Sequence, residues 1–581
     1  MVGIEYKPYI IDTDYMFPPS LTDFLGPEDE VHIFAEVTAH LDVSHLNSDF
    51  SGMGQHPYHP LMLLRLLMWG MANRIFSTRQ IEVLTHRDVS YIYLAGGQRP
   101  DFRSLARFRR RNAPEIEKLF KQTVILCVRL GMVNLAHIAL DGTKFKANTS
   151  KHKAISYGRM KQAEERLKKE IEDLMRQAEA MDKEEDEQFG EANNGYHLPE
   201  ELQRREHRLE KISRLKEELE AEKRKEQGLP EGVSPQIEDK EQRSFADYEG
   251  RIMPMKSGGF DYAYNGQAAT DEEQGVVVAA DLTNQAADTG HLPGIVDQVK
   301  ELREGLEISA EDQQTEMSAD SGYFSAANIR AEGEGIELLI ASGRENKEPQ
   351  GETEGNRIYP LSRFDYDKNA DMWRCPDGRF LVRQMETPVS DSSGFYRYTC
   401  LGCDGCKLRQ HCLKPRQDQR VLEVSGDQLL HGEMRARLKQ PEKQAIYRKR
   451  KWVAEQTMGQ IKESLGFRGV TVRGEQYARA QWLMVCAVHN VMKAVRFIVQ
   501  KREARIKEVE ATIGLRRLVG GALNSALKQR SKIHHLLASF ERDFRRPTGQ
   551  RLSDLAHGLK RNASRLLWIS NLRSLAVSCR A

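Results

Sequence analysis

Cysteine, aromatic side chains and long apolar runs are all scarce in this sequence. Its 581 residues include 8 cysteines, and 7% of them are aromatic. Eight cysteines are too few for a disulfide scaffold of this length, which indicates a reducing compartment. No uninterrupted apolar run approaches the roughly 18 residues that span a bilayer, so we expect a soluble chain without a membrane partner. The first residues carry acids early and lack a basic segment before an apolar one, so we expect no secretory signal and a cytoplasmic location.

Two common catalytic signatures are missing as well. The chain has no G-x-x-x-x-G-K-[ST] loop, so an ATP-driven motor is not supported. It also has no H-E-x-x-H pair, which argues against a zinc hydrolase.

Charge is unevenly distributed along the chain. The net charge of the whole chain is +2. Residues from 441 onward include 29 Lys and Arg and 10 Asp and Glu, whereas the residues before 441 include 58 Lys and Arg and 75 Asp and Glu. A basic C-terminal part favours a polyanionic partner, most simply nucleic acid. The alternative is an ordinary solvated helical surface.

The N-terminal part has a helical pattern. Over residues 28–135, segments such as HPLMLLRLLMWGMANRIF repeat apolar residues at three- and four-residue spacing. Ser77 and Asp101 suit N-caps, and Gly96-Gly97 suits a break, so the layout is similar to a helix-turn-helix. Its last helix carries the cations Arg103, Arg107, Arg109, Arg110 and Arg111, which suit contacts with DNA phosphates and bases. A small bundle with an exposed basic face is the alternative.

Two charged helices are expected after a short strand. Residues 160–181 and 202–219 repeat apolar residues at threes and fours, and a Gly, Asn and Pro-containing segment separates them. The expected apolar seams are Leu167, Ile171, Leu174, Ala178 and Met181, and Leu202, Leu209, Ile212 and Leu219. We expect an antiparallel helical hairpin, which serves either subunit contact or simply as a solvated arm.

Five strand-like runs predict a mixed α/β sheet. They are HIALDG, GGFDYAYNGQAATDE, GVVVAADLTN, EMSADSGYF and ELLIASGR, and helical segments lie between them. Residues 345–440 read as polar and irregular, and the chain becomes helical and basic again from about residue 441.

Three apolar strand-like runs end in an acid, at Asp141, Asp281 and Asp320. A fourth acid, Glu455, lies in a helix-compatible run. Acids at strand ends have positions fixed by the backbone, and two of them with a helical third can hold two divalent ions. Such a pair of ions suits phosphodiester chemistry, and hard oxygen ligands select Mg²⁺ or Mn²⁺.

The sequence resembles a DDE transposase of a bacterial insertion sequence. The resemblance rests on the order of HPLMLLRLLMWG, DFRSLARFRRRN, ALDGTKFKANTS, DYAYNGQAATDE, VVVAADLTNQAADTGHL, ADSGYFSAANI and AEQTMGQIKESLGFRG, over about residues 40–495. It implies a ribonuclease H-like fold whose catalytic, metal-binding acids are Asp141, Asp320 and Glu455. It also implies a Tyr, an Arg and a Lys on the helix of the Glu, which match Tyr447, Arg450 and Lys462.

The implied function is cutting and joining DNA. Two Mg²⁺ or Mn²⁺ ions would support strand hydrolysis at the element end, and the freed 3′-hydroxyl would then attack target DNA. The resemblance implies double-stranded DNA as partner, a homodimer in the synaptic complex and a nucleoid-associated location. We expect DNA contacts from Arg103, Arg107, Arg110, Tyr447, Arg450, Lys462, Arg468 and Arg473. The alternatives are a ribonuclease H-like nuclease without strand transfer and an inactive DNA-binding descendant.

Asp281 and Glu463 are weaker candidates for the acidic site. In a ribonuclease H-like sheet the first and fourth strands are neighbours, whereas the third lies two strand spacings from the first. Asp281 on that third strand could not share the ions of Asp141, so we expect a capping or supporting role. Glu463 follows Glu455 by eight residues, about 80° further round a helix.

A second metal site is indicated by clustered cysteines. Four of them form a C-x-x-C-x-x-C-x5-C pattern, namely Cys400, Cys403, Cys406 and Cys412. Four thiolates can close a tetrahedral site, so we expect a structural Zn²⁺, in which Cys375 could also take part. An iron–sulfur run has similar spacing, although Leu413 stands where Pro is usual, and free thiols are the remaining alternative. Cys127 and Cys486 lie in apolar helical contexts and are expected in the core.

The sequence therefore predicts six parts. They are an N-terminal helical DNA-binding domain (1–135), a ribonuclease H-like core in two pieces (136–158 and 250–344), a helical-hairpin insertion (159–249), an insertion with the cysteine cluster (345–440), the end of the core with the Glu helix (441–499) and a basic helical tail (500–581).

Overall fold

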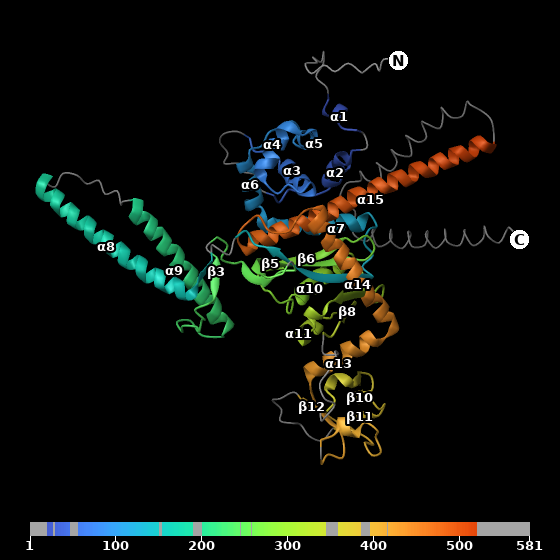
Figure 1. Cartoon of the computed structure of the whole chain (residues 1–581). Helices are drawn as coiled ribbons and strands as arrows, with labels where there is room; N and C mark the ends of the chain where they lie inside the picture. The colour runs from blue at the N-terminus through green and yellow to red at the C-terminus, as the bar shows by residue number, and fades with distance from the viewer. Residues whose placement is uncertain are drawn as a thin grey trace, which may run out of the picture.

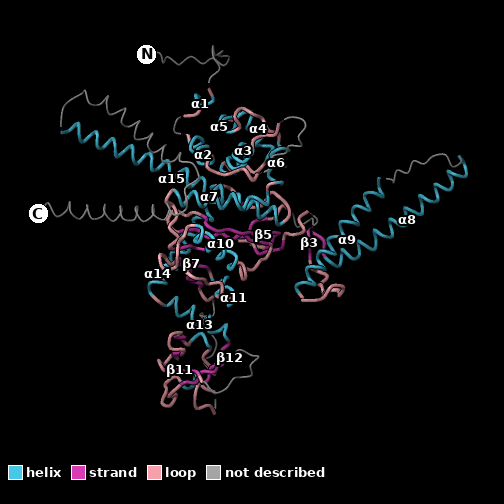
Figure 2. Tube along the Cα trace, turned by 180° about the vertical axis from the view of Figure 1, so that it is seen from behind, coloured by secondary structure: helices cyan, strands magenta, loops and turns pink. Residues whose placement is uncertain are grey.

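A computed structural model shows a central sheet with the N-terminal helices on one side of it, a helical arm and a smaller sheet (Figure 1). The structure describes residues 20–26, 29–46, 56–149, 154–189, 200–244, 246–256, 258–343, 358–384, 395–414 and 416–519. Seen from behind, the arm and the smaller sheet again stand away from the central sheet (Figure 2). The part of the predicted tail from residue 520 onward lies outside the described residues.

Short helices build the N-terminal region, as the apolar spacing predicts. They are α1 (Leu21–Phe24), α2 (Glu30–Thr38), α3 (Pro60–Ala72), α4 (Thr78–Arg87), α5 (Val89–Leu94), α6 (Phe102–Arg111), the 3₁₀ turn η1 (Ala113–Glu115) and α7 (Ile116–Arg129). Asp101 caps α6 by accepting a hydrogen bond from the Ser104 amide at 2.5 Å, and Gly96 and Gly97 break the chain before it at φ +58° and +73°. The break and the cap set the direction of α6.

The central sheet contains the five predicted strands and one short addition. They are β1 (His137–Lys146), β4 (Arg251–Pro254), β5 (Phe260–Asp271), β6 (Val277–Thr283), β7 (Thr315–Ala319) and β8 (Ile336–Ile340). The strand order is β4-β5-β1-β7-β8, and β6 pairs with β5. β1 runs antiparallel to β5 and parallel to β7, so the sheet is mixed, as predicted.

Two strands are longer than their apolar runs suggested. β1 continues past Asp141 to Lys146, and β6 continues past Asp281 to Thr283. Both acids therefore lie within strands, whereas Asp320 does follow the end of its strand, β7. A polar residue within a strand does not break the ladder when its side chain leaves toward a crevice, so the apolar run underestimates the strand length.

Helices cover both faces of the sheet. These are α10 (Leu292–Gly305), the short α11 (Ala326–Ile329), α14 (Pro441–Gly459), the π-helical turn η6 (Gln460–Ser464) and α15 (Glu475–Val519), and the 3₁₀ turn η3 (Ser321–Tyr323) follows β7. α14 crosses β1, and α15 lies against β6 and α7.

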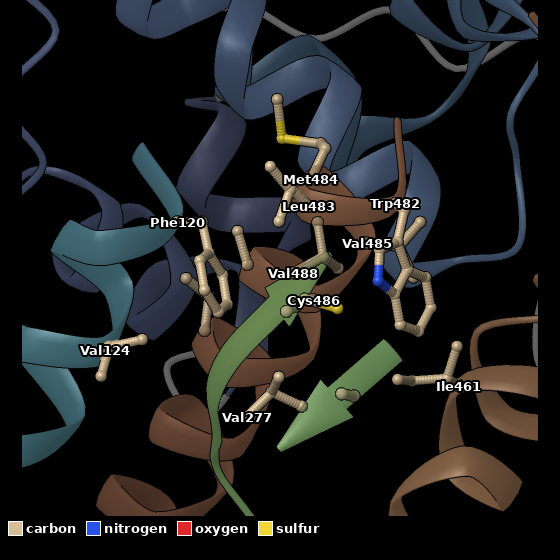
Figure 3. Packing of buried hydrophobic residues seen from close by; sticks show 14 of the residues in the cluster. Phe120, Val124, Val277, Ile461, Trp482, Leu483, Met484, Val485, Cys486 and Val488 are labelled. Carbon is tan, nitrogen blue, oxygen red and sulfur yellow. The ribbon is translucent and has the colours of Figure 1, made fainter. Parts of the chain in front are cut away.

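The first half of α15 forms the middle of the core. Trp482, Leu483, Val485, Cys486 and Val488 pack among side chains of α7 and β6 (Figure 3). The predicted core cysteines are confirmed, because Cys127 and Cys486 are fully buried. Residues 475–507 are long and apolar enough to cross a membrane, but 78% of the apolar stretch is buried inside the protein. A helix that is apolar on all sides is typical of the centre of a large core.

The arm consists of α8 (Tyr157–Phe189) and α9 (Glu200–Glu226), which pack against each other. The short strands β2 (Ala154–Ser156) and β3 (Gln242–Ser244) pair at its base. Met160, Leu167, Ile212 and Leu215 form its buried seam. The side chains of Ala178, Met181 and Leu202 lie outside the described residues.

The cysteine-bearing segment is not irregular, contrary to the sequence-based expectation. It folds as an antiparallel sheet of β9 (Asp365–Asp367), β10 (Met372–Arg374), β11 (Phe380–Arg383), β12 (Phe395–Cys400) and β13 (Val421–Ser425), with the 3₁₀ turn η5 (Leu361–Arg363), α12 (Arg409–Cys412) and α13 (Gly426–Lys439). Its own core includes Trp373, Tyr398 and four cysteines. Strands of three to six residues are too short for an alternating pattern to stand out in the sequence.

Candidate active site

Asp141 and Asp320 lie opposite each other on neighbouring strands. The parallel register pairs Ala139 of β1 with Ser318 of β7. Two residues further along, the same register brings Asp141 level with Asp320, and Asp320 keeps an extended backbone at φ −78° and ψ 178°. Neighbouring strands are about 4.8 Å apart, and residues at the same level project from the same face. The sheet therefore brings these two predicted site residues together.

The two aspartates influence each other and are partly shielded from solvent. Burial raises the pKa of Asp141, the charges of Lys256 and Arg450 oppose this rise, and the charge of Asp320 adds to it. Asp320 Oδ1 accepts a hydrogen bond from the Gly322 amide at 2.8 Å, which fixes its carboxylate at the start of η3. The pair favours a bound cation, because two carboxylates so close repel one another without one.

The helix α14 is held across β1 by apolar contact and by ion pairs. Val453 and Ala454 pack on Ala139, which lies on the same face of β1 as Asp141. Near the start of the helix, Lys443 Nζ lies 2.6 Å from Glu316 of β7 and also pairs with Glu337 of β8. These contacts fix the face of α14 that meets the sheet.

Glu455 follows Ala454 on this helix, and its side chain is exposed. Within the described part of the chain, no group of three or more His, Cys, Asp or Glu side chains is arranged to hold a metal ion. Glu455 thus lies on the helix that packs beside Asp141, without forming a closed cluster with the two aspartates. Its role as the third acid stays a prediction.

The three residues implied on the helix of the Glu also approach the aspartates. The Arg450 guanidinium lies 5.7 Å from the Tyr447 ring, and its Nε is a buried donor without a partner in the described residues. Burial raises the pKa of Tyr447, and Asp320 contributes to the rise. Lys462 on η6 donates a hydrogen bond to Thr143, on the same face of β1 as Asp141. A π-helical turn is a frequent feature of functional sites.

Lys256 also belongs to this group of charges, although it is not among the residues predicted from the sequence. Burial lowers the pKa of Lys462, and the neighbouring Lys256 lowers it further. Lys256 lies in the turn between β4 and β5, which contains Gly258 and Gly259 at φ +91° and +74°. The sequence shows only a lysine close to two glycines, which indicates a turn. A turn does not indicate which face of the sheet the lysine side chain approaches.

Asp281 and Glu463 each pair with an arginine. β6 pairs with β5 and not with β1, so Asp281 lies two strands from Asp141, as expected. Its carboxylate accepts a hydrogen bond from Arg479 at 2.5 Å. Glu463 pairs with Arg468 at 2.7 Å on the surface. Both acids therefore have cationic partners of their own.

Two depressions in the described part of the chain are lined by basic side chains. One, of about 380 Å³, lies between α6 and the start of α15 and is lined by Arg107, Arg110, Arg111, Pro114, Gln476 and Tyr477. The other, of about 450 Å³, lies at the end of β1 and is lined by Lys146, Ala147, Asn148, Thr149, Arg468, Gly469, Val470 and Arg473. Arg103, Arg107 and Arg110 are exposed on α6, whereas Arg109 is half-buried and burial lowers its pKa. Of the cations predicted to contact DNA, Arg107 and Arg110 line the first depression and Arg468 and Arg473 line the second. Arg450 and Lys462 lie near the aspartates.

Five cysteines lie in the smaller sheet and its loops, namely the predicted Cys400, Cys403, Cys406 and Cys412 together with Cys375. Cys375, Cys400, Cys403 and Cys412 are buried, whereas Cys406 is partly exposed. Burial raises the pKa of Cys400 to about 12, and Cys403, Cys375 and Cys412 add to the rise. Backbone amides donate hydrogen bonds to Cys375 Sγ at 3.3 Å and to Cys403 Sγ at 3.4 Å. Cys375 thus joins the buried thiols.

The mixed sheet, with two aspartates on neighbouring strands and α14 packed on one of these strands, agrees with the ribonuclease H-like core that the resemblance implies. Comparison with known families narrows this fold class. A family model described as "Transposase DDE domain" matches residues 374–495, and one described as "Transposase domain (DUF772)" matches residues 22–111. Together they support a DDE transposase of an insertion sequence, which confirms the resemblance. No curated protein and no solved structure matches the chain. The first match includes Glu455, whereas neither match includes Asp141 or Asp320.

Proposed function

We propose that this chain is an insertion-sequence transposase that binds the element ends, cleaves DNA in a divalent-metal-dependent reaction and joins the 3′-hydroxyl to target DNA. The observation that carries the proposal is the register that brings Asp141 level with Asp320 on adjacent strands. The two transposase family matches agree with it, and one of them covers the helix of Glu455.

Asp141 and Asp320 would hold the metal ions together with Glu455. Carboxylate oxygens are the ligands that Mg²⁺ and Mn²⁺ prefer, and the mutual repulsion of the aspartates favours a cation between them. When bound, two such ions lower the pKa of the attacking oxygen and neutralise the leaving oxygen. Glu455 would complete the site when its exposed side chain turns toward β1.

The cations near the site would hold the DNA backbone. The unpartnered Nε of Arg450 is a buried donor beside two carboxylates, which suits a phosphate that carries its own negative charge. Lys462 would contact a neighbouring phosphate, and the two basic depressions would receive other parts of the DNA backbone. A homodimer would hold the two element ends together.

A gel assay with a labelled element-end duplex, a target duplex and Mg²⁺ tests the proposal. We expect cleaved ends and joined molecules from the native chain, and neither from Asp141→Asn or Asp320→Asn. Cleavage without joining would favour a nuclease. If the native chain bound the duplex tightly and never cut it, an inactive DNA-binding descendant would be the better account.

A structural Zn²⁺ on the smaller sheet is the second part of this proposal. Support comes from the four buried thiols and from the two N–H···S hydrogen bonds, since thiolates close tetrahedral sites and accept such bonds. The described thiols are not yet arranged as a closed metal site, so binding would have to draw them together. The ligand set that the burial favours is Cys375, Cys400, Cys403 and Cys412.

Metal content measured by mass spectrometry tests this ligand set. We expect about one zinc per chain in the native protein and in Cys406→Ser, and a loss of zinc in Cys375→Ser. Equal zinc in Cys375→Ser with a loss in Cys406→Ser would restore the set predicted from the sequence.

A further inference from the structure

Asp288 is an acidic residue for which the proposed chemistry has no role, and it contacts both segments that carry the aspartates. It lies in the loop between β6 and α10, and its side chain is about three-quarters buried. Its Oδ1 accepts hydrogen bonds from Asn265 at 2.7 Å, from Gln267 at 3.0 Å and from Lys144 at 3.3 Å. These donors come from β1 and β5, so one oxygen ties the loop to both strands.

Two glycines let this carboxylate approach the backbone beside each aspartate. At Gly142, directly after Asp141, an added Cβ would lie 2.9 Å from Asp288 Oδ1. At Gly322, two residues after Asp320, an added Cβ would lie 3.3 Å from Asp288 Oδ2. Neither position has room for a side chain of ordinary size, so the carboxylate packs directly on the main chain at both places.

The same geometry limits the distance between the two carboxylates. Asp320 Oδ1 lies 3.0 Å from the Cβ point at Gly322, and Asp288 Oδ2 lies 3.3 Å from it, so these oxygens are at most 6.3 Å apart. Positions 142 and 144 of β1 belong to the face of the sheet opposite to that of Asp141, because side chains alternate along a strand. Asp288 therefore supports Asp141 from the opposite face of the sheet, through the backbone.

The charge of Asp288 is retained in this environment. Burial alone would raise the pKa of Asp288, but Asn265, Lys144 and Gln267 stabilise the carboxylate and lower it overall. Gln267 also accepts a hydrogen bond from Tyr323 of η3, so the network continues into the turn that Asp320 begins. A fixed negative charge close to Asp320 adds to the attraction of a divalent cation for that carboxylate.

We propose that Asp288 is a positioning residue, which sets the backbone at Asp141 and Asp320 and strengthens divalent-cation binding between them. The proposal depends on the proposed function, because it assumes that the two aspartates hold metal ions. Asp288 is not a catalytic residue in this account, since it acts through Gly142 and Gly322.

Calorimetric titration of Mn²⁺ into the metal-free chain tests the proposal without any need for activity. One unit charge about 8 Å from a divalent ion, at an effective dielectric constant between that of a protein surface and that of water, changes affinity by roughly 5- to 30-fold. We expect Asp288→Asn to weaken Mn²⁺ binding by about this factor and to raise the half-saturating Mn²⁺ for DNA cleavage equally. Asp281→Asn is the matched control, since Asp281 lies two strands from Asp141, and should bind Mn²⁺ within about twofold of the native chain.

A second variant covers the case in which Asp288→Asn does not fold. Gly322→Ala leaves the three hydrogen-bond donors of Asp288 in the chain but adds a methyl group against Asp288 Oδ2 and Asp320 Oδ1, and it should also weaken Mn²⁺ binding. If a folded Asp288→Asn binds Mn²⁺ as tightly as the native chain, the positioning role is overturned and the proposed function stays intact. If Asp288→Asn does not fold, native Mn²⁺ affinity in Gly322→Ala has the same consequence. A native chain that neither binds Mn²⁺ nor cleaves DNA would overturn both.

Discussion

Removal of Lys443 should release α14 from the sheet. The Lys443 side chain is 18% exposed and pairs with Glu316 and Glu337, which are 17% and 15% exposed. Lys443→Met leaves two largely buried carboxylates without this cation. Breaking a buried pair from one side costs about 3–5 kcal/mol. Arg437, 3.4 Å from Glu337, partly compensates, so we expect a loss of about 2–3 kcal/mol.

Urea unfolding of the native chain and two variants measures this loss. Lys451→Met is the matched control, because Lys451 is exposed on the same helix and its change should stay within about 0.5 kcal/mol. A double-mutant cycle with Glu316→Gln should give a coupling of at least about 1 kcal/mol. Because Arg450 and Glu455 lie on α14, Lys443→Met should also reduce DNA cleavage. Equal unfolding midpoints for Lys443→Met and Lys451→Met would refute this account of α14.

Three further predictions concern stability and DNA binding. Burial raises the pKa of Asp271 from 3.8 to about 6, so its ionisation costs about 3 kcal/mol of stability. That stability is lost as the pH rises from about 4 to 6. The free energy of unfolding of the native chain should therefore exceed that of Asp271→Asn by more at pH 4.5 than at pH 7.5. An equal difference at the two pH values, measured by denaturant unfolding, would contradict this prediction. Arg110→Ala should reduce the slope of log affinity for DNA against log salt by about 1, whereas an unchanged slope would remove Arg110 from the interface. Trp482→Ala should cost about 3–5 kcal/mol in urea unfolding, because the ring is fully buried beside Phe145; a loss below about 1 kcal/mol would be contrary to the packing.

The main elements of the fold could be predicted from periodicity. Helices such as α3 and α7, and the five strands of the central sheet, carry the apolar spacing of their type. The strand neighbourhood of Asp141 and Asp320 followed from the fold that the resemblance implied, and the register agrees with it. Periodicity could not give the full length of β1 and β6, because Asp141 and Asp281 interrupt the apolar pattern inside these strands.

The smaller sheet and the polar network under the site could not be predicted from the sequence. Each strand from β9 to β13 is too short to show an alternation, and its core depends on contacts between strands. Asp288 sits in a polar loop, and only the folded chain reveals that its partners come from β1 and β5. The burial of Cys375, on which the proposed ligand set depends, likewise follows from the folded sheet.

Iron-mediated cleavage of the protein backbone is the most direct test of the central claim that Asp141, Asp320 and Glu455 share divalent ions. Fe²⁺ substituted for Mg²⁺ in the DNA-bound chain, with added hydrogen peroxide and ascorbate, generates hydroxyl radicals that cut the peptide backbone close to the metal. We predict cuts near all three residues, suppressed by excess Mg²⁺ and absent in Asp141→Asn. Cuts near Asp141 and Asp320 with none near Glu455 would contradict the shared site.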